Sequence, residues 1–469
     1  MLEKIVTAVN NVIWSPALVA LLVGAGLYFS IRTRFVQLRR FGLMARLLFR
    51  KRDPGSEKKG VSSFEAFCIA LSGRVGTGNI VGVATAIALG GPGAIFWMWV
   101  IAFFGASTAF VESTLAQLFK FTHKTGFRGG PACYIEKGLK SRWMAVLFAV
   151  VTIIACGLML PTVQANGMAT AAMNSFNISP LYSGLFLAAV LGLVIVGGVK
   201  RVAKAASLIT PLMAVIYVII SLVILALNWR AIPGLLALIV NNALGINPLC
   251  GGILGSTIML GVKRGLFSNE AGQGTGAIPS ASADVKHPAE QGLVQAFSVY
   301  VDTLLVCTAT ALMILSAGTF NILDAKTGEM LLANDPALGA NYVGYTQAAV
   351  DSVISGFGSV FVSIALAFFV FTTVMAYYIY SESSVMYLCS LGKKVSPKVE
   401  ALMIRILQLV IIAAVVFGAV KEANLVWTLG DIGIGIMAWV NVVAIIILAP
   451  KAFKTLREYE GMLKENSRK

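Results

Sequence analysis

Eleven apolar segments, each long enough to cross a lipid bilayer, follow one another along the 469 residues of this chain. The chain is 58% hydrophobic and 12% charged, whereas a soluble domain carries about 25% charged residues. This pattern predicts an all-α integral membrane protein. The segments lie at roughly 11–31, 64–90, 92–119, 143–172, 179–199, 206–227, 247 to the 270s, 291–318, 353–380, 399–420 and 424–449.

The loops between these segments differ in charge. Arg32–Gly60 holds ten Lys or Arg against two acidic residues, and Lys120–Arg142 holds six against one. Because basic loops stay in the cytoplasm, we expect the amino terminus outside the cell membrane, Thr319–Val350 outside, and the tail from Lys451 inside. Part of the first basic segment, around Phe41–Phe49, is expected to form an interfacial helix. Topology therefore explains the net charge of +16, and the expected partner is the lipid bilayer rather than nucleic acid.

Gly-rich polar sequence interrupts two of the segments. Gly73–Asn79 reads GRVGTGN, and Gly261–Gly276 reads GVKRGLFSNEAGQGTG. A glycine costs a helix about 1 kcal/mol relative to alanine, and an arginine at mid-membrane costs about 2.5–3.5 kcal/mol. Irregular backbone at this depth indicates a buried or water-lined site. The alternative is that the glycines only allow helices to pack closely.

The position of the two breaks predicts the repeat structure. Without the first segment ten remain, and the broken ones are the first and the sixth. This spacing predicts two inverted five-helix repeats. We expect one transport domain over 1–469, with an extra helix and a basic cytoplasmic segment in 1–60, a first repeat in 61–227, a second in 228–449 and a cytoplasmic tail in 450–469.

Two motifs resemble those of a known family. Gly90–Trp99 reads GGPGAIFWMW and Arg264–Gly272 reads RGLFSNEAG, and both resemble signatures of the alanine or glycine:cation symporters, also called sodium:alanine symporters, of the amino acid–polyamine–cation superfamily. The resemblance covers essentially the whole chain. It implies a leucine-transporter-type fold of about 11 helices, with one extra amino-terminal helix. It also implies sodium-coupled uptake of alanine, glycine or a close relative.

The two breaks are expected to bind an amino acid zwitterion. A helix that restarts after Gly78 offers free N–H groups and a positive dipole end to a carboxylate, and carbonyl groups freed in the second break suit the ammonium group. Gln164 is expected to contact the substrate across the cavity, and a capping or interhelical hydrogen bond is its alternative role. The residues expected to bind substrate are Thr77, Gly78, Asn79, Gln164, Phe267, Ser268 and Asn269.

A sodium site is implied by a second resemblance. Val75–Asn79 is similar to the unwound helix of the neurotransmitter:sodium symporters, and Phe371–Thr373 is similar to the hydroxyl pair of their sodium site. Arg74 lies where those proteins have a small residue near a second sodium site, so one sodium per cycle is expected. The alternative for the hydroxyl groups is bonding to their own helix. The residues implied to bind sodium are Ser72 and Val75, through carbonyl groups, and Thr372 and Thr373.

Charged residues within the apolar segments need partners. We expect them to form a buried network that gates the cavity or carries protons, and the alternative is a water-screened cytoplasmic vestibule. Glu112 and Asp302 leave proton coupling open. The residues concerned are Arg74, Glu112, Lys263, Arg264, Glu270 and Asp302.

Other functional classes lack the residues that they need. The only histidines, His123 and His287, fall in loops, and the six cysteines are scattered without a CxxC motif. A haem, zinc or redox centre is therefore not expected, nor is an enzyme, and sodium is the only expected ion. A larger neutral amino acid such as glutamine, a D-amino acid, or proton coupling are alternatives within the transporter class. A channel would need a repeated polar pore lining rather than one pair of broken helices.

Overall fold

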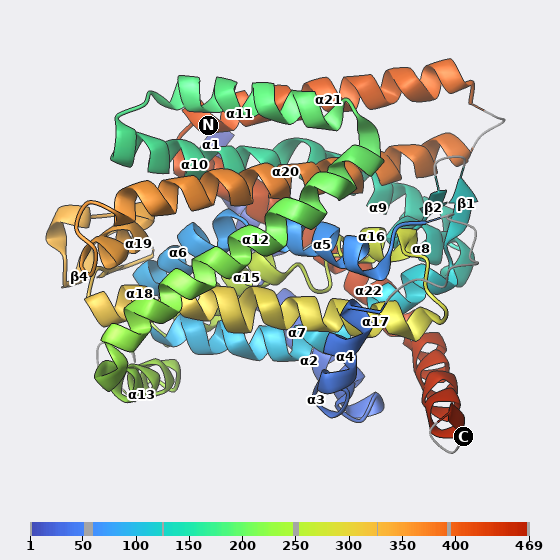
Figure 1. Cartoon of the computed structure of the whole chain (residues 1–469), viewed down its shortest axis with the longest axis horizontal. Coiled ribbons are helices and arrows are strands. Elements are labelled where there is room, and N and C mark those ends of the chain that lie inside the picture. Colours follow the sequence, from blue (N-terminus) through green and yellow to red (C-terminus); the bar gives the residue numbers. More distant parts are fainter. Residues whose placement is uncertain are drawn as a thin grey trace.

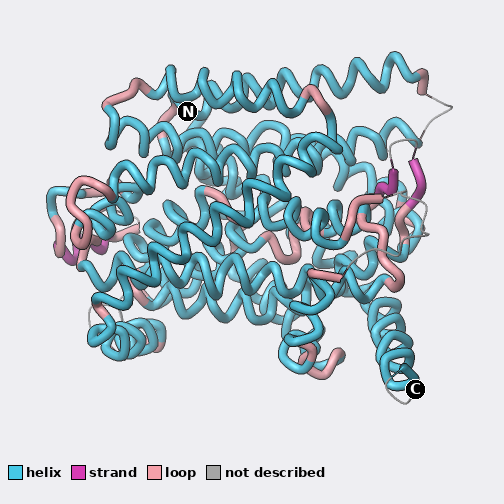
Figure 2. The backbone as a smooth tube through the Cα atoms, in the orientation of Figure 1, coloured by secondary structure: helices cyan, strands magenta, loops and turns pink. Residues whose placement is uncertain are grey.

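The computed structural model describes residues 2–50, 60–123, 126–246, 253–325, 327–391 and 395–466, and most of them are helical (Figure 2). The first half of the chain forms α1 (Leu2–Ile13), α2 (Pro16–Arg32), α3 (Val36–Arg39), α4 (Phe41–Leu48), α5 (Ser63–Arg74), α6 (Val83–Gly90), α7 (Gly93–Leu118), α8 (Pro131–Leu139), α9 (Arg142–Ile154), α10 (Leu160–Phe176), α11 (Pro180–Ile195), α12 (Gly198–Leu227) and α13 (Ile232–Ala243). The second half forms α15 (Leu254–Asn269), α16 (Ala277–Ser282), α17 (Pro288–Val299), α18 (Thr308–Ala317), α19 (Tyr342–Asp351), α20 (Gly358–Ser390), α21 (Pro397–Val420) and α22 (Ala423–Asn466). Shorter helical elements are the π-helices η1 (Gly78–Gly82), η2 (Ala155–Met159) and η4 (Tyr300–Cys307) and the 3-10 helices η3 (Trp229–Ala231) and η5 (Pro336–Leu338).

The long helices lie side by side along the long axis of the molecule (Figure 1). Antiparallel hairpins lie at its two ends. One pairs β1 (Phe121–His123) with β2 (Gly126–Arg128) beside α8, and the other pairs β3 (Asn321–Leu323) with β4 (Met330–Ala333) beside α19. We call these the α8 end and the α19 end of the bundle.

The helices match the predicted spans in order. Among the described residues, eight helical stretches are long and apolar enough to cross a membrane, and the bent pair formed by α5 with η1 and α6 makes a ninth. The two other predicted segments correspond to α11, a shorter apolar helix, and to the interrupted pair of α15 and α16. The chain therefore has the expected all-α multi-pass architecture, and the exact number of eleven spans stays a prediction.

The outer faces of the bundle carry apolar side chains. On α12, Leu208, Leu212, Val215 and Ile219 are more than half exposed, and their spacing of three and four residues places them on one face. A face of this kind suits contact with lipid.

Several predicted boundaries differ from the structure. α12 begins at Gly198 rather than near 206, because Gly198 takes a positive φ of 71° and turns the chain directly from α11. α22 continues through Pro450 to Asn466, so most of the predicted tail is helical. The burial of Ala452, Phe453, Leu456 and Tyr459, which form one apolar stripe, stabilises this extension. Its last turns project from the side of the bundle (Figure 1).

The two long loops also contain secondary structure. The basic loop Lys120–Arg142 holds the first hairpin and α8, and the acidic loop Thr319–Val350 holds the second hairpin and most of α19. The helix expected around Phe41–Phe49 is present as α4. Other parts of the predicted topology lie outside the described residues: 51–59 of the first basic segment, 247–252 at the start of the second broken segment with Cys250, and the loop lysines Lys393 and Lys394.

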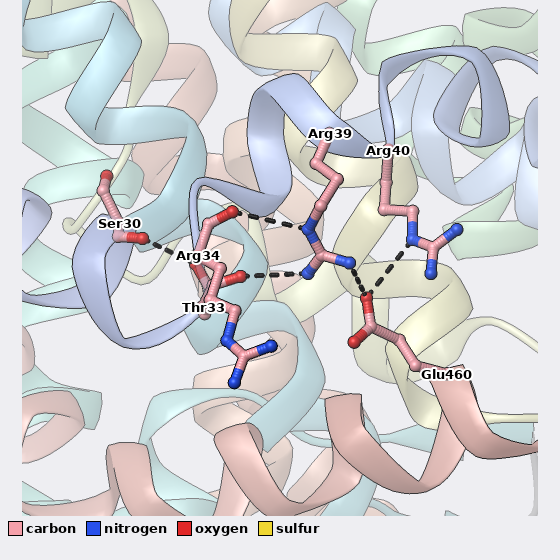
Figure 3. Close-up of polar contacts among 6 residues, drawn as sticks. All are labelled: Ser30, Thr33, Arg34, Arg39, Arg40 and Glu460. Atoms are coloured by element: carbon pink, nitrogen blue, oxygen red, sulfur yellow. Dashed lines mark hydrogen bonds and ion pairs between the residues drawn. The ribbon is translucent and has the colours of Figure 1, made fainter.

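The amino-terminal and carboxyl-terminal segments are joined by ion pairs. Arg39 Nη1 lies 2.5 Å from Glu460 Oε1 on α22, and Arg40 Nε lies 3.2 Å from the same oxygen (Figure 3). Arg39 also donates to the carbonyl oxygens of Thr33 and Arg34, at 3.2 and 3.4 Å. Arg34 has a positive φ of 55°, a backbone conformation that non-glycine residues rarely adopt, and these bonds support the turn at this residue.

Candidate functional site

The first break is shorter than the sequence predicted. α5 continues to Arg74, Val75 takes an extended conformation, and the helix resumes as η1 at Gly78 after a bend of 51°. Gly76 is required at this point, because a Cβ there would lie 2.6 Å from Thr373 Oγ1 and 2.8 Å from Gln164 Oε1. The break itself therefore packs closely against α10 and α20.

Two backbone N–H groups of this break donate to side chains that were predicted to bind substrate. The Gly76 N–H donates to Asn79 Oδ1 at 2.8 Å, and the Thr77 N–H donates to Gln164 Oε1 at 2.9 Å. Gln164 therefore makes the interhelical hydrogen bond that was its alternative role. A carboxylate bound here would compete for the same donors.

The second break is also shorter than predicted. Residues 261–269 are helical within α15, and the irregular segment is 270–276. A Cβ on Gly261 would lie 2.5 Å from the Ala94 carbonyl oxygen, and one on Gly265 would lie 2.3 Å from Ile101 Cγ2. These two glycines serve close packing on α7, the alternative considered for them. Gly272 and Gly274 have positive φ values of 93° and 86° and belong to the break itself.

Asp302 joins the two breaks. Its Oδ1 accepts a hydrogen bond of 2.6 Å from Asn79 Nδ2, and its two oxygens lie 3.1 and 2.9 Å from Ser268 Oγ. Thr303 Oγ1 donates to Oδ2 at 2.7 Å. All four residues are fully buried. Asp302, which was grouped with the gating charges, thus lies among the residues predicted to bind substrate.

Aromatic rings cover this centre toward the α19 end. The Phe267 and Trp427 ring centroids are 4.9 Å apart, and the Arg264 guanidinium carbon lies 5.5 and 4.8 Å from them. Arg264 Nη2 and Lys263 Nζ each lie 2.6 Å from Asp431 Oδ2. These three charged residues form a buried cluster, which we call the outer cluster.

A second group of charges lies on the other side of the centre. Arg74 donates from Nε to the Asn269 carbonyl oxygen at 2.6 Å, from Nη1 to Gln295 Oε1 at 3.0 Å, and to Ser298 Oγ. Glu270 has a positive φ of 56° and accepts from Thr275 Oγ1 at 2.9 Å and Tyr380 OH at 3.4 Å.

Glu112, on α7, completes this second group. Its Oε2 accepts a 3.0 Å hydrogen bond from Asn441 Nδ2, and Asn441 Oδ1 accepts from Tyr134 OH. Burial raises the pKa of Tyr134, in α8, above its ordinary value, so its hydroxyl stays protonated and donates. The backbone amides of Gly272 and Gly274 also face Glu112. We call Arg74, Glu112 and Glu270 the inner cluster.

The residues implied to bind sodium lie beside the first break. Thr373 Oγ1 is 3.1 Å from the Val75 carbonyl oxygen and 2.8 Å from that of Phe369. The hydroxyls of Thr372 and Ser72 bond within their own helices, to Phe369 and Ile69 at 3.0 and 2.8 Å. The structure thus brings Thr373 and Val75 together, although Thr373 also bonds within its own helix. The Thr372 hydroxyl makes only local bonds among the described residues, and the role implied for Ser72 concerns its carbonyl group rather than its hydroxyl.

Sequence reasoning missed several residues of the site, although some carried a signal. Asp431 and Asn441 interrupt the last apolar segment, and the rule that led to Arg74 and Glu112 applies to them equally. Tyr380 and Trp427 carried no such signal, because an aromatic residue in an apolar span normally packs.

The chain is similar to known proteins. The profile of the family described as "Sodium:alanine symporter family" matches residues 1–469. The Bacillus subtilis (strain 168) protein YrbD is 50% identical over 460 residues, which cover 98% of this chain and 93% of that protein. The "Sodium/proton-dependent alanine carrier protein" of Bacillus sp. (strain PS3) is 47% identical over 410 residues, covering 87% and 90%.

A solved structure supports the fold. MhsT, solved in complex with L-phenylalanine, matches with a TM-score of 0.58 and 13% sequence identity, covering 86% of this chain and 99% of that chain. At this identity the match concerns the fold alone. The chain has the leucine-transporter-type architecture that the broken helices and the motifs implied.

Proposed function

The chain belongs to the sodium:alanine symporter family, and we propose that it takes up alanine, glycine or a close relative together with sodium. The observation that carries the proposal is the polar centre formed by the two breaks, where Asn79 and Ser268 meet at Asp302 within an apolar bundle. Transport by alternating access needs one buried site of this kind, closed toward each side in turn. The amino acid crosses unchanged, so no enzymatic step is involved.

The two ends of the amino acid suit the two breaks. The carboxylate binds at the N–H groups of Thr77, Gly78 and Asn79, of which that of Thr77 now donates to Gln164 Oε1 and that of Asn79 to the Gly76 carbonyl oxygen. The ammonium group binds at the carboxyl end of α15, beside Phe267 and Ser268, where Asp302 adds a negative charge. Asn269 contributes less, because its carbonyl oxygen accepts from Arg74.

Sodium binds beside the first break in this proposal. The carbonyl oxygens of Ser72 and Val75 and the hydroxyls of Thr372 and Thr373 supply its oxygen ligands, and the 3.1 Å contact between Thr373 and Val75 supports the position. One charge crossing 100 mV yields about 2.3 kcal/mol, and a tenfold sodium gradient adds about 1.4 kcal/mol. One sodium ion therefore suffices for accumulation of several-hundred-fold. We place the protein in the cell membrane with its amino terminus outside and its carboxyl terminus in the cytoplasm.

The test is uptake of radiolabelled L-alanine by proteoliposomes with sodium, potassium or a pH gradient imposed. Saturable accumulation that requires inward sodium is expected. Asn79→Ala should abolish alanine binding, and Thr373→Val should weaken sodium binding by about tenfold or more, since it removes a hydrogen-bonding oxygen from a charged ligand. Thr428→Val is the matched control, because the exposed Thr428 hydroxyl bonds only within α22.

Each other outcome contradicts a stated part of the proposal. Binding of glutamine or a D-amino acid without alanine uptake would change the substrate. Uptake driven by a pH gradient without sodium would remove the sodium site. Flux that does not saturate would indicate a channel.

A further inference from the structure

Gly276 packs against two charged side chains, Arg74 of α5 and Glu112 of α7. A Cβ on Gly276 would lie 2.5 Å from Arg74 Nη2 and 3.8 Å from Glu112 Oε1, so both atoms lie close to the same face of this glycine. Within the described part of the chain, neither atom has a hydrogen-bond partner, and Glu270 Oε1 has none either. Arg74, Glu112 and Glu270 are at most 1% exposed.

The charges of the inner cluster do not balance. Two carboxylates face one guanidinium, and neither carboxylate forms an ion pair with Arg74 in the part of the chain that the structure describes. A buried carboxylate without a paired cation is costly, and it becomes neutral by taking up a proton. Arginine keeps its charge under all ordinary conditions. One proton on the cluster makes it neutral.

Glu112 is also the member of the cluster with a polar connection to the α8 end. Its Oε2 accepts from Asn441, which accepts from Tyr134 on α8. A Cβ on Gly274 would lie 2.4 Å from Pro131 Cγ and 3.1 Å from Asn441 Cγ, so α8 and this amide meet at the second break. Pro131 also lines a small pocket, together with Cys133, Phe148 and Tyr387.

We propose that Glu112 is a proton-binding site, filled from the α8 end and coupled to the first break through Arg74. In the described arrangement Glu112 is protonated, with the O–H bond on Oε1, and Arg74 bonds to Asn269, Gln295 and Ser298. When the proton returns to water, the Glu112 carboxylate attracts Arg74 Nη2, which lies on the same side of Gly276. This draws the end of α5 away from α15 and α17. The inference deepens the proposed function, on which it rests, by adding a proton to the transport cycle.

The groups that surround Glu112 determine how readily it binds a proton. The charged or titratable groups are Arg74 on α5, Tyr134 on α8 and, beyond Arg74, Glu270 in the break and Asp302 in η4. From α22 the neighbour is the amide of Asn441. α17 contributes uncharged Gln295 and Ser298 around Arg74.

The first test detects the proton on Glu112 directly. Infrared spectra of the purified full chain at neutral pH should contain the C=O stretch of protonated carboxyl groups, and the spectra of the wild type and of each variant are compared. The band should lose intensity in Glu112→Gln, where the other buried carboxyl groups still contribute to it, and Glu112→Asp should shift the Glu112 contribution without removing it. Glu382→Gln is the matched control, because Glu382 is another buried carboxylate on the α8 side, outside the inner cluster, and the band should remain. An unchanged band in Glu112→Gln would overturn the proposal.

The second test measures whether proton flux is coupled to alanine transport, in proteoliposomes that contain a pH-sensitive dye. Alanine added with sodium should drive protons inward in the wild type and in Glu382→Gln, and Glu112→Gln should reduce this flux to the level of protein-free liposomes. Equal proton flux in Glu112→Gln and the wild type would overturn the inference. If the wild type does not transport alanine, the proposed function fails, and the infrared band still decides whether Glu112 binds the proton.

Discussion

The outer and inner clusters contain similar residues in opposite proportions. In the outer cluster, two cations share one carboxylate, with both Lys263 and Arg264 2.6 Å from Asp431. In the inner cluster, two carboxylates accompany one arginine, and Arg74 bonds to carbonyl, amide and hydroxyl oxygens instead. Excess carboxylates can become neutral by binding protons, whereas an arginine cannot lose its charge. The Arg264–Asp431 pair of the outer cluster is therefore fixed in charge, and the inner cluster can change its charge.

The largest expected effect is on the outer cluster. Asp431→Asn should lower the free energy of unfolding by about 3–5 kcal/mol, because it leaves two buried cations without a carboxylate. Arg74→Met should cost less, about 1–3 kcal/mol, because the remaining carboxylates can take up protons and only hydrogen bonds are lost. The measurement is denaturant unfolding of the purified protein in detergent. Replacing both Arg264 and Asp431 by apolar residues should recover part of the loss. Equal losses in the two single variants would contradict the comparison.

Lys120, at the α8 end, differs from the arginines of the two clusters, because it is a partly buried cation that can lose its proton. It donates to Gln117 Oε1 and to the Ala283 carbonyl oxygen at 2.7 and 2.9 Å. Burial lowers the pKa of Lys120 from 10.5 to about 8, and Asp284 opposes the shift. Below pH 8, both the folded and the unfolded chain bind this proton. Between about 8 and 10.5 the unfolded chain binds more, so stability should rise with pH.

The check on Lys120 is the unfolding temperature across this pH range. Lys120→Met should remove the rise that Lys120 contributes, and Lys137→Met, which changes an exposed lysine of α8, should retain it. A rise of the same size in Lys120→Met would assign the effect to another group.

The smallest expected effect concerns charges outside both clusters. Glu460→Gln removes the contacts to Arg39 and Arg40, whose side chains are 37% and 28% exposed. Solvent weakens such pairs, so the loss should be below about 1 kcal/mol and should disappear in high salt. Thermal unfolding at low and high salt measures it. A larger loss that persists in salt would show that the contact between α3 and α22 acts through packing rather than charge.

The fold was largely predictable because its determinants are local. An apolar run long enough for the bilayer and a basic loop after it can be read from neighbouring residues. A break within Gly73–Asn79 was predicted, because Arg74 and the glycines around it are costly within an apolar span, and the structure has it at Val75–Thr77. The ends of the breaks were not predictable. Gly261 and Gly276 look alike in the sequence, yet one packs on α7 and the other borders the inner cluster.

By itself, the sequence determined that this chain is a multi-pass helical protein with two broken helices, and its motifs determined the family. Hydropathy, loop charge and glycine content are properties of neighbouring residues, so they can be evaluated without knowing the fold. Only the tertiary structure decided which buried charges meet. Asp431 lies 167 residues from Arg264, and Asn441 lies 329 from Glu112. Such pairs depend on how helices from distant parts of the chain pack, and no local property of either residue determines its partner.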